Sequence, residues 1–227
     1  MKKIIIGLLS GVFLLVITCC AVVYKAPDFP QRQRQHKLIA ITPLNVTVQY
    51  RKLPEGVTVD EIKKNEEDLG RYFQDQLYTR FLQRIDSYTI DFQDVSKTNN
   101  ILNQNNINYQ LLRDYSKEDL ASHLGVDAVL SGNIITSQPM STGGAVAMAF
   151  LLGLWGPTNT VGVAITIHDG SDSKLLWKYE HTYSGTIGSS SEQVTKALFK
   201  HLSKKFPYLK YTSRTRNSDL FYDDLYY

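Results

Sequence analysis

The residues best suited to covalent chemistry are two adjacent cysteines, Cys19 and Cys20, which are the only cysteines in the 227-residue chain. They follow an uncharged run at residues 4–18 (IIIGLLSGVFLLVIT), and that run follows the positively charged start Met1-Lys2-Lys3. The absence of cysteine after residue 20 excludes disulfides, thiolate nucleophiles and cysteine-ligated zinc from the rest of the chain. Thiol chemistry is therefore confined to the N-terminus.

This order of features is typical of a bacterial lipoprotein signal, with a positive start, an apolar stretch, a small residue and a cysteine that receives lipid. The segment Val16–Cys19 resembles a lipobox, although Thr18 stands where Gly, Ala or Ser is more usual. The shifted segment Ile17–Cys20 departs from the pattern in the same way. We therefore predict a signal peptide at residues 1–18 and lipid on Cys19 or Cys20, with Cys19 slightly favoured.

A different kind of anchor fits the same residues. If Ala21–Tyr24 is added, the apolar run Ile4–Tyr24 has 21 residues, and a membrane-spanning helix needs about 20. An uncleaved single-pass anchor is thus the alternative to lipidation. Both interpretations place the body outside the cytoplasm. We expect a bacterial cell-membrane protein, lipid-anchored at the outer membrane, whose body faces the periplasm or the exterior.

The body of the chain contains no recognisable catalytic or metal-binding spacing. It lacks G-x-S-x-G, and the Gly/Ser-rich residues 185–191 lack the lysine of a P-loop, so they suggest a helix cap. No two histidines have the i, i+4 spacing of a helical metal site. We predict a protein that is not an enzyme and has no cofactor or metal. The five histidines are His36, His123, His168, His181 and His201.

The charge of the body argues against nucleic acid as a partner. The chain has 25 basic and 22 acidic residues, a formal net charge of +3. Without Lys2 and Lys3, which belong to the targeting segment, 23 basic residues face 22 acidic ones, which gives +1. Phosphate backbones are bound by a basic excess, and this body has almost none.

The pattern along the body predicts one α/β domain at residues 37–208, with a mixed sheet covered by helices. A lipid-anchored tether at residues 19–36 precedes it, and a mobile tail at 209–227 follows. The predicted strands are residues 37–43, 46–50, 88–92, 126–135, 160–168 and 175–183, the last two forming a hairpin. The predicted helices are residues 58–85, 97–103, 116–124 and 189–205, three of which open with capping residues.

Three segments carry a family resemblance: Asp94–Asn99, Ser116–Leu120 and Leu124–Gly132 (LGVDAVLSG). Together they resemble the corresponding passage of TolB amino-terminal and CsgG-like domains. The chain over residues 1–208 also resembles uncharacterised bacterial lipoproteins of the Bacteroidota type, through segments such as Tyr24–Phe29 and Leu176–Tyr179. The resemblance implies an envelope-associated binding or assembly module. The long amphipathic strand pairs of CsgG pores are missing, so pore formation is not implied.

One apolar segment suggests a contact with a partner. Residues 143–156 (GGAVAMAFLLGLWG) are apolar throughout but too short to span a bilayer as a helix. They either form a buried helix under the sheet or an exposed surface for self-assembly, an envelope protein or the membrane. The side chains predicted to form this interaction segment are Phe150, Leu151, Leu152, Leu154 and Trp155.

These features favour a lipid-anchored structural or assembly component of the cell envelope that acts through protein contacts. Its predicted partners are membrane lipid, held through the anchor, and a second copy or another envelope protein. The alternative is a module that binds a small envelope ligand, which requires a pocket with convergent polar groups.

Overall fold

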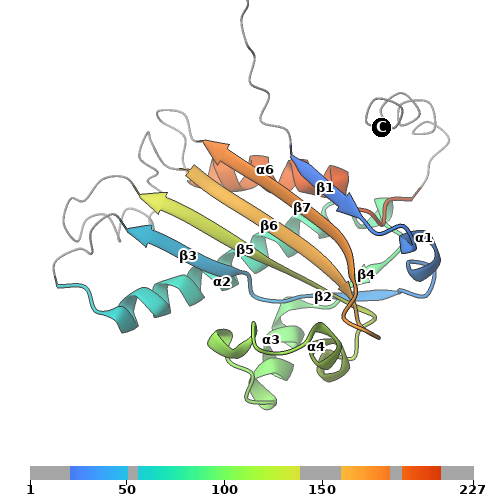
Figure 1. Cartoon of the computed structure of the whole chain (residues 1–227), viewed down its shortest axis with the longest axis horizontal. Coiled ribbons are helices and arrows are strands. Elements are labelled where there is room, and N and C mark those ends of the chain that lie inside the picture. The colour runs from blue at the N-terminus through green and yellow to red at the C-terminus, as the bar shows by residue number, and fades with distance from the viewer. Residues whose placement is uncertain (1–20, 51–55, 139–159, 185–190, 211–227) are drawn as a thin grey trace, which may run out of the picture.

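The domain is built on a seven-stranded mixed β-sheet (Figure 1). The computed structural model describes residues 21–50, 56–138, 160–184 and 191–210. The strand order is β1-β7-β6-β5-β2-β4, and β3 pairs with β5 beyond the end of β2. Helices pack on this sheet, which confirms the predicted α/β class.

Strand β5 (Ala128–Gln138) is the centre of the sheet because it pairs with three other strands. Strands β2 (Leu38–Ile41) and β3 (Asn45–Tyr50) both run parallel to it, one after the other. The two strands therefore lie on the same side of β5, and the break between them, Thr42–Leu44, contains Pro43. Strand β4 (Asp91–Phe92) follows the short helix η1 (Ile85–Ser87) and pairs with β2. It is shorter than predicted, because Tyr88 bridges Leu209 instead and residues 89–90 form a bend.

Strands β6 (Thr160–Asp169) and β7 (Leu175–Ser184) form the predicted antiparallel hairpin. The alternation in β6 sends Val161, Val163, Ile165 and Ile167 to one face, where all four are buried. Residues 162, 164, 166 and 168 therefore face the opposite side of the sheet.

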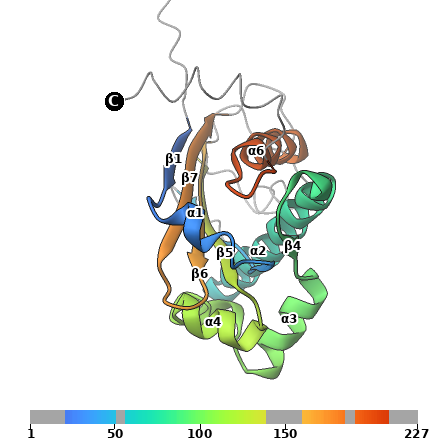
Figure 2. The same cartoon turned by 90° about the vertical axis from the view of Figure 1, so that its right-hand side faces the viewer.

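Helices α2 (Val59–Leu82) and α6 (Ser191–Lys205) cover the first of these faces (Figure 2). Helix α2 begins with the predicted capping box, in which Thr58 and Glu61 exchange hydrogen bonds. Its inward stripe includes Leu69, Phe73 and Leu77, which pack against β2, β3 and α6 in the main core. This layer buries most of the apolar surface of the domain.

Two shorter helices cover only one end of the opposite face. Helices α3 (Val95–Gln104) and α4 (Lys117–Leu124), joined through η2 (Tyr109–Leu111), pack a second core against Ala40 and Val129. Gly125 ends α4 with φ 64°, the left-handed conformation that favours glycine. The remainder of this face, formed by β1, β5, β6 and β7, carries no helix among the described residues (Figure 1).

Residues 21–36 of the predicted tether (19–36) are instead part of the folded domain. Strand β1 (Val22–Lys25) pairs antiparallel with β7, and helix α1 (Phe29–Arg32) follows it. Ala26 and Phe29 are each 2% exposed and His36 is 6% exposed. A few apolar anchors and ion pairs fix this segment, which the sequence pattern alone did not indicate. At the other end, Leu209 bridges Tyr88, whereas residues 211–227 lie outside the described ranges.

Helix α2 packs closely against the β2–β3 connection at Gly70. A Cβ atom at this position would overlap the Leu44 carbonyl oxygen and the Tyr109 ring. The Tyr109 hydroxyl accepts a hydrogen bond from Val46 N at 2.8 Å and lies 3.0 Å from the Leu44 oxygen. Val48 N donates to Glu66 Oε1 at 3.0 Å. Side chains thus bind backbone groups on the outer side of β3.

Gly70→Ala is expected to lower the free energy of unfolding by about 1–3 kcal/mol, because the added methyl group must displace backbone or a buried ring. Gly162→Ala is the matched control, since its added Cβ would meet only the Ile135 oxygen, at 3.9 Å. We expect the control to change stability by no more than about 0.5 kcal/mol. Urea unfolding of both variants measures the difference, and equal effects would contradict the close packing at Gly70.

Candidate functional site

The open face of the sheet, defined here as the part formed by β1, β3, β5, β6 and β7 that no described helix covers, is the candidate site. The strand register arranges its side chains in rows that cross the sheet. One row runs from β3 to β1 through Asn45, Asn133, Ala164, Glu180 and Val22. The sequence places these residues far apart, and only the register brings them into one line.

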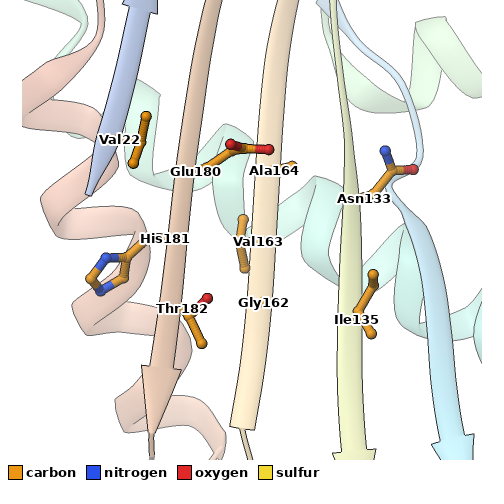
Figure 3. A pocket seen from close by; sticks show the side chains of 9 residues that line it. All are labelled: Val22, Asn133, Ile135, Gly162, Val163, Ala164, Glu180, His181 and Thr182. Atoms are coloured by element: carbon orange, nitrogen blue, oxygen red, sulfur yellow. The ribbon is translucent and has the colours of Figure 1, made fainter. Parts of the chain in front are cut away.

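Small residues hollow this face at its centre. Gly162 and Ala164 are consecutive outward positions of β6, so the middle strand has almost no side-chain volume there. The resulting depression has a volume of about 440 Å³ and is bordered by Asn133, Glu180 and Thr182 (Figure 3). In the same view the His181 side chain extends to the other side, where its ring stacks on His201 of α6.

The depression continues toward α4 as a groove, defined as the space of about 470 Å³ between η2–α4 and the open face. Its floor carries hydroxyl and amide groups in cross-strand pairs. Ser131 Oγ and Thr166 Oγ1 are 3.2 Å apart, and Asn45 donates to Asn133 at 3.0 Å. The complete lining is Thr42, Pro43, Asn45, Leu112, Arg113, Lys117, Ser131, Gly132, Asn133, Ala164, Thr166, His168, Leu175, Lys178 and Glu180.

The charged groups of the groove are not balanced. Lys178 Nζ forms an ion pair with Glu180 at 2.7 Å, which neutralises that lysine. Lys117 and Arg113 form no ion pair with any described residue. Burial lowers the pKa of Lys117, since its ammonium loses water without gaining an acidic partner. The groove therefore has a net positive charge.

His168 lies at the end of the groove beneath α4. Burial, together with the nearby Lys117, lowers the pKa of His168 to about 4. Its Nδ1 is enclosed by protein and has no hydrogen-bond partner among the described atoms. A neutral ring with its proton on Nε2 avoids leaving an unpaired donor at that position, so Nε2 is the expected donor.

A second cluster of charges joins α1 to the β6–β7 turn. The Arg32 guanidinium contacts Asp28, Asp169 and Asp172 at 2.8–2.9 Å. His36 lies between Asp169, at 3.4 Å, and the Tyr208 hydroxyl, at 2.6 Å. Each acid of this cluster has a basic partner, which indicates a structural clamp and not an open site.

Hydrogen bonds set the ionisation of this clamp. Lys174 and Arg32 lower the pKa of Asp28 to about 2. Burial alone would raise the pKa of Asp169, but hydrogen bonds from Ser171 and Arg32 outweigh it and hold the pKa below its usual value. Both acids are therefore charged at neutral pH, as the clamp requires.

Several of the residues singled out from the sequence lie outside the part of the chain that the structure describes. Cys19, Cys20 and the interaction segment Phe150–Trp155 lie outside the described residues, as does the Gly/Ser-rich stretch up to residue 190. Within the described ranges, no three His, Asp or Glu side chains are arranged to hold a metal ion. The groove was not predicted. Its signal was the pair of small residues, Gly162 and Ala164, on the polar side of an alternating strand.

No family model and no curated protein matches the chain. Among solved structures, it is similar to lipoprotein GNA1162 from Neisseria meningitidis, with 13% identity and a TM-score of 0.42. That match covers 74% of this chain and 94% of the other. A PelC dodecamer from Paraburkholderia phytofirmans matches with 13% identity, 81% and 94% coverage and a TM-score of 0.41.

The C-terminal domain of LpoB from Salmonella enterica is a more distant match, with 7% identity and a TM-score of 0.34. It covers 69% of this chain and 95% of the other. The structural neighbours thus include a bacterial lipoprotein by name. The resemblance to TolB amino-terminal and CsgG-like domains stays a prediction, because no family model matches.

His168 is expected to titrate near pH 4 in the folded protein, because burial and Lys117 disfavour its charged form. The unfolded ring binds its proton near pH 6.5, so stability should fall as the pH drops from about 6.5 to about 4. NMR of the ring protons measures the midpoint. Lys117→Gln should raise it, and a wild-type midpoint near 6.5 would contradict the buried, neutral ring.

Proposed function

We propose that the protein is a lipid-anchored, non-catalytic binding module of the bacterial cell envelope, held at the membrane by Cys19 or Cys20. The outer membrane is the proposed location, with the domain facing the periplasm or the exterior. The domain acts through contacts made by its surface, and the open face of the sheet, which no described helix covers, is the part that we assign to them.

This proposal rests on the pairing of Val22–Lys25, as strand β1, with β7. The alternative, a single-pass helix over Ile4–Tyr24, needs residues that β7 already binds through backbone hydrogen bonds. Ala21 also packs against the main core. Residues 4–20 are then left, and 17 residues span about 26 Å as a helix, less than the ~30 Å hydrocarbon core. Lipid attachment requires no such length. Among the described residues, none of the helices is both long and apolar enough to cross a membrane.

Attachment at Cys19 or Cys20 would leave almost no flexible linker. Val22 is three residues beyond Cys19, so their Cα atoms are at most about 10 Å apart. The edge of the sheet at β1 would therefore lie close to the lipid headgroups. Val22 is 64% exposed and Tyr24 is 45% exposed on this edge, which is compatible with an interfacial position.

The mass of the mature protein tests the anchor. We expect loss of residues 1–18 and a mass increase from acyl groups, removed by Cys19→Ala and retained in Cys20→Ala. The opposite pattern would move the lipid to Cys20. Retention of Met1–Thr18 without added lipid in the wild type would establish the single-pass alternative, because only that anchor keeps its first residues.

Protein contacts through the interaction segment Phe150–Trp155 are the second part of the proposal. An apolar run of this length needs a covering surface, and a second copy or an envelope protein can provide it. Light scattering of the lipid-free domain is expected to show an oligomer that Leu151→Asp and Trp155→Asp each dissociate. A folded monomer in all three proteins would exclude self-assembly through this segment.

A further inference from the structure

The groove contains an unpaired cation in a position that ordinarily disfavours one. Lys117 is the first residue of α4, where the helix dipole is positive and acidic side chains are preferred. Glu118 and Asp119 in the same turn are exposed, and Asp119 serves the helix cap through its hydrogen bonds with Ser116. Lys117 instead lines the groove.

The groups facing Lys117 from the sheet are donors. Ser131 and Thr166 contribute hydroxyls, of which Thr166 Oγ1 donates to the Ser131 carbonyl oxygen at 3.3 Å, and His168 contributes its ring, with Nε2 as the expected donor. Glu180 is the acid of the groove, and Lys178 already binds it. Arg113 adds a further positive charge at the rim. An incoming anion thus meets donors from the helix above and from the sheet below.

We propose that the groove binds a phosphate group, with Lys117 as its counter-ion and with His168 Nε2 and the Ser131 hydroxyl as hydrogen-bond donors. Donors approaching from several directions suit a tetrahedral oxyanion, and lysine binds phosphate as a point charge. The volume of about 470 Å³ accommodates a small organic phosphate. This inference deepens the proposed binding function by naming the chemistry of a ligand.

Two sources of phosphate are consistent with the fold. A soluble phosphate ester can enter the groove from solvent. A lipid headgroup is the other source, because the row from Val22 to Asn133 crosses only three strand spacings, about 14 Å. The groove would therefore lie near the membrane if the β1 edge does.

The pKa of the His168 ring reports binding, since an anion beside the ring favours its charged form. NMR titration of the full-length protein in detergent, with and without inorganic phosphate, tests the soluble source. Nanodiscs of phosphatidylglycerol, compared with the protein in phosphate-free detergent, test the headgroup. A rise in the His168 pKa in either arm supports the proposal and identifies the source.

Three variants control the measurement. Lys117→Gln should weaken phosphate binding by about tenfold or more, whereas Lys117→Arg should retain most of it. Lys200→Gln, on the exposed surface of α6 behind the sheet, removes the same charge elsewhere and should change nothing. The change on adding phosphate is compared within each variant, because Lys117 also affects the free ring.

The proposal is overturned if phosphate and anionic lipid both leave the His168 pKa unchanged in the wild type. It is also overturned if Lys117→Gln binds as tightly as wild type while its amide spectrum shows a folded domain, or if Lys200→Gln weakens binding equally. Either result would leave the mass of the lipidated N-terminus unaffected, so the anchor and the groove fail separately.

Discussion

The pairing of β1 with β7 is the constraint on which the remaining structure depends. It places Val22–Lys25 in the sheet, and Arg32 then binds three acids of the same region, so the N-terminal segment is fixed twice. The apolar N-terminal run is thereby shortened, which disfavours a spanning helix and favours lipid. The same pairing extends the open face by one strand and orients it relative to any anchor at residues 19–20.

The sequence pattern was sufficient for elements whose hydrophobic period is regular. The hairpin β6–β7 and the helices α2 and α4 were predicted because each has one apolar face, and both helices begin with a capping residue. For residues 25–36 the prediction of a tether was wrong for a physical reason. Their fixation comes from Phe29 in the core and from Arg32 bound to Asp169, 137 positions away. A local composition rich in proline and glutamine cannot show such partners.

The candidate site was less predictable than the fold, because it is a product of register. The register of β3, β5, β6 and β7 alone brings Asn45, Asn133 and Glu180 into one row. The sequence pattern could not show that, of the described helices, only α3 and α4 cover part of the face that carries this row, or that Lys117 comes from a separate helix to its edge.

The two faces of the sheet therefore have different roles. The face under α2 and α6 buries the main core, and its tolerance to change is low, as Gly70 against Leu44 and Tyr109 illustrates. The open face contributes little to that core, so its residues are free to be chosen for binding. A half-buried lysine with no acidic partner among the described residues costs stability that packing does not require. Such a cost is most simply explained by a ligand that offsets it, and an anion is the chemistry that would do so.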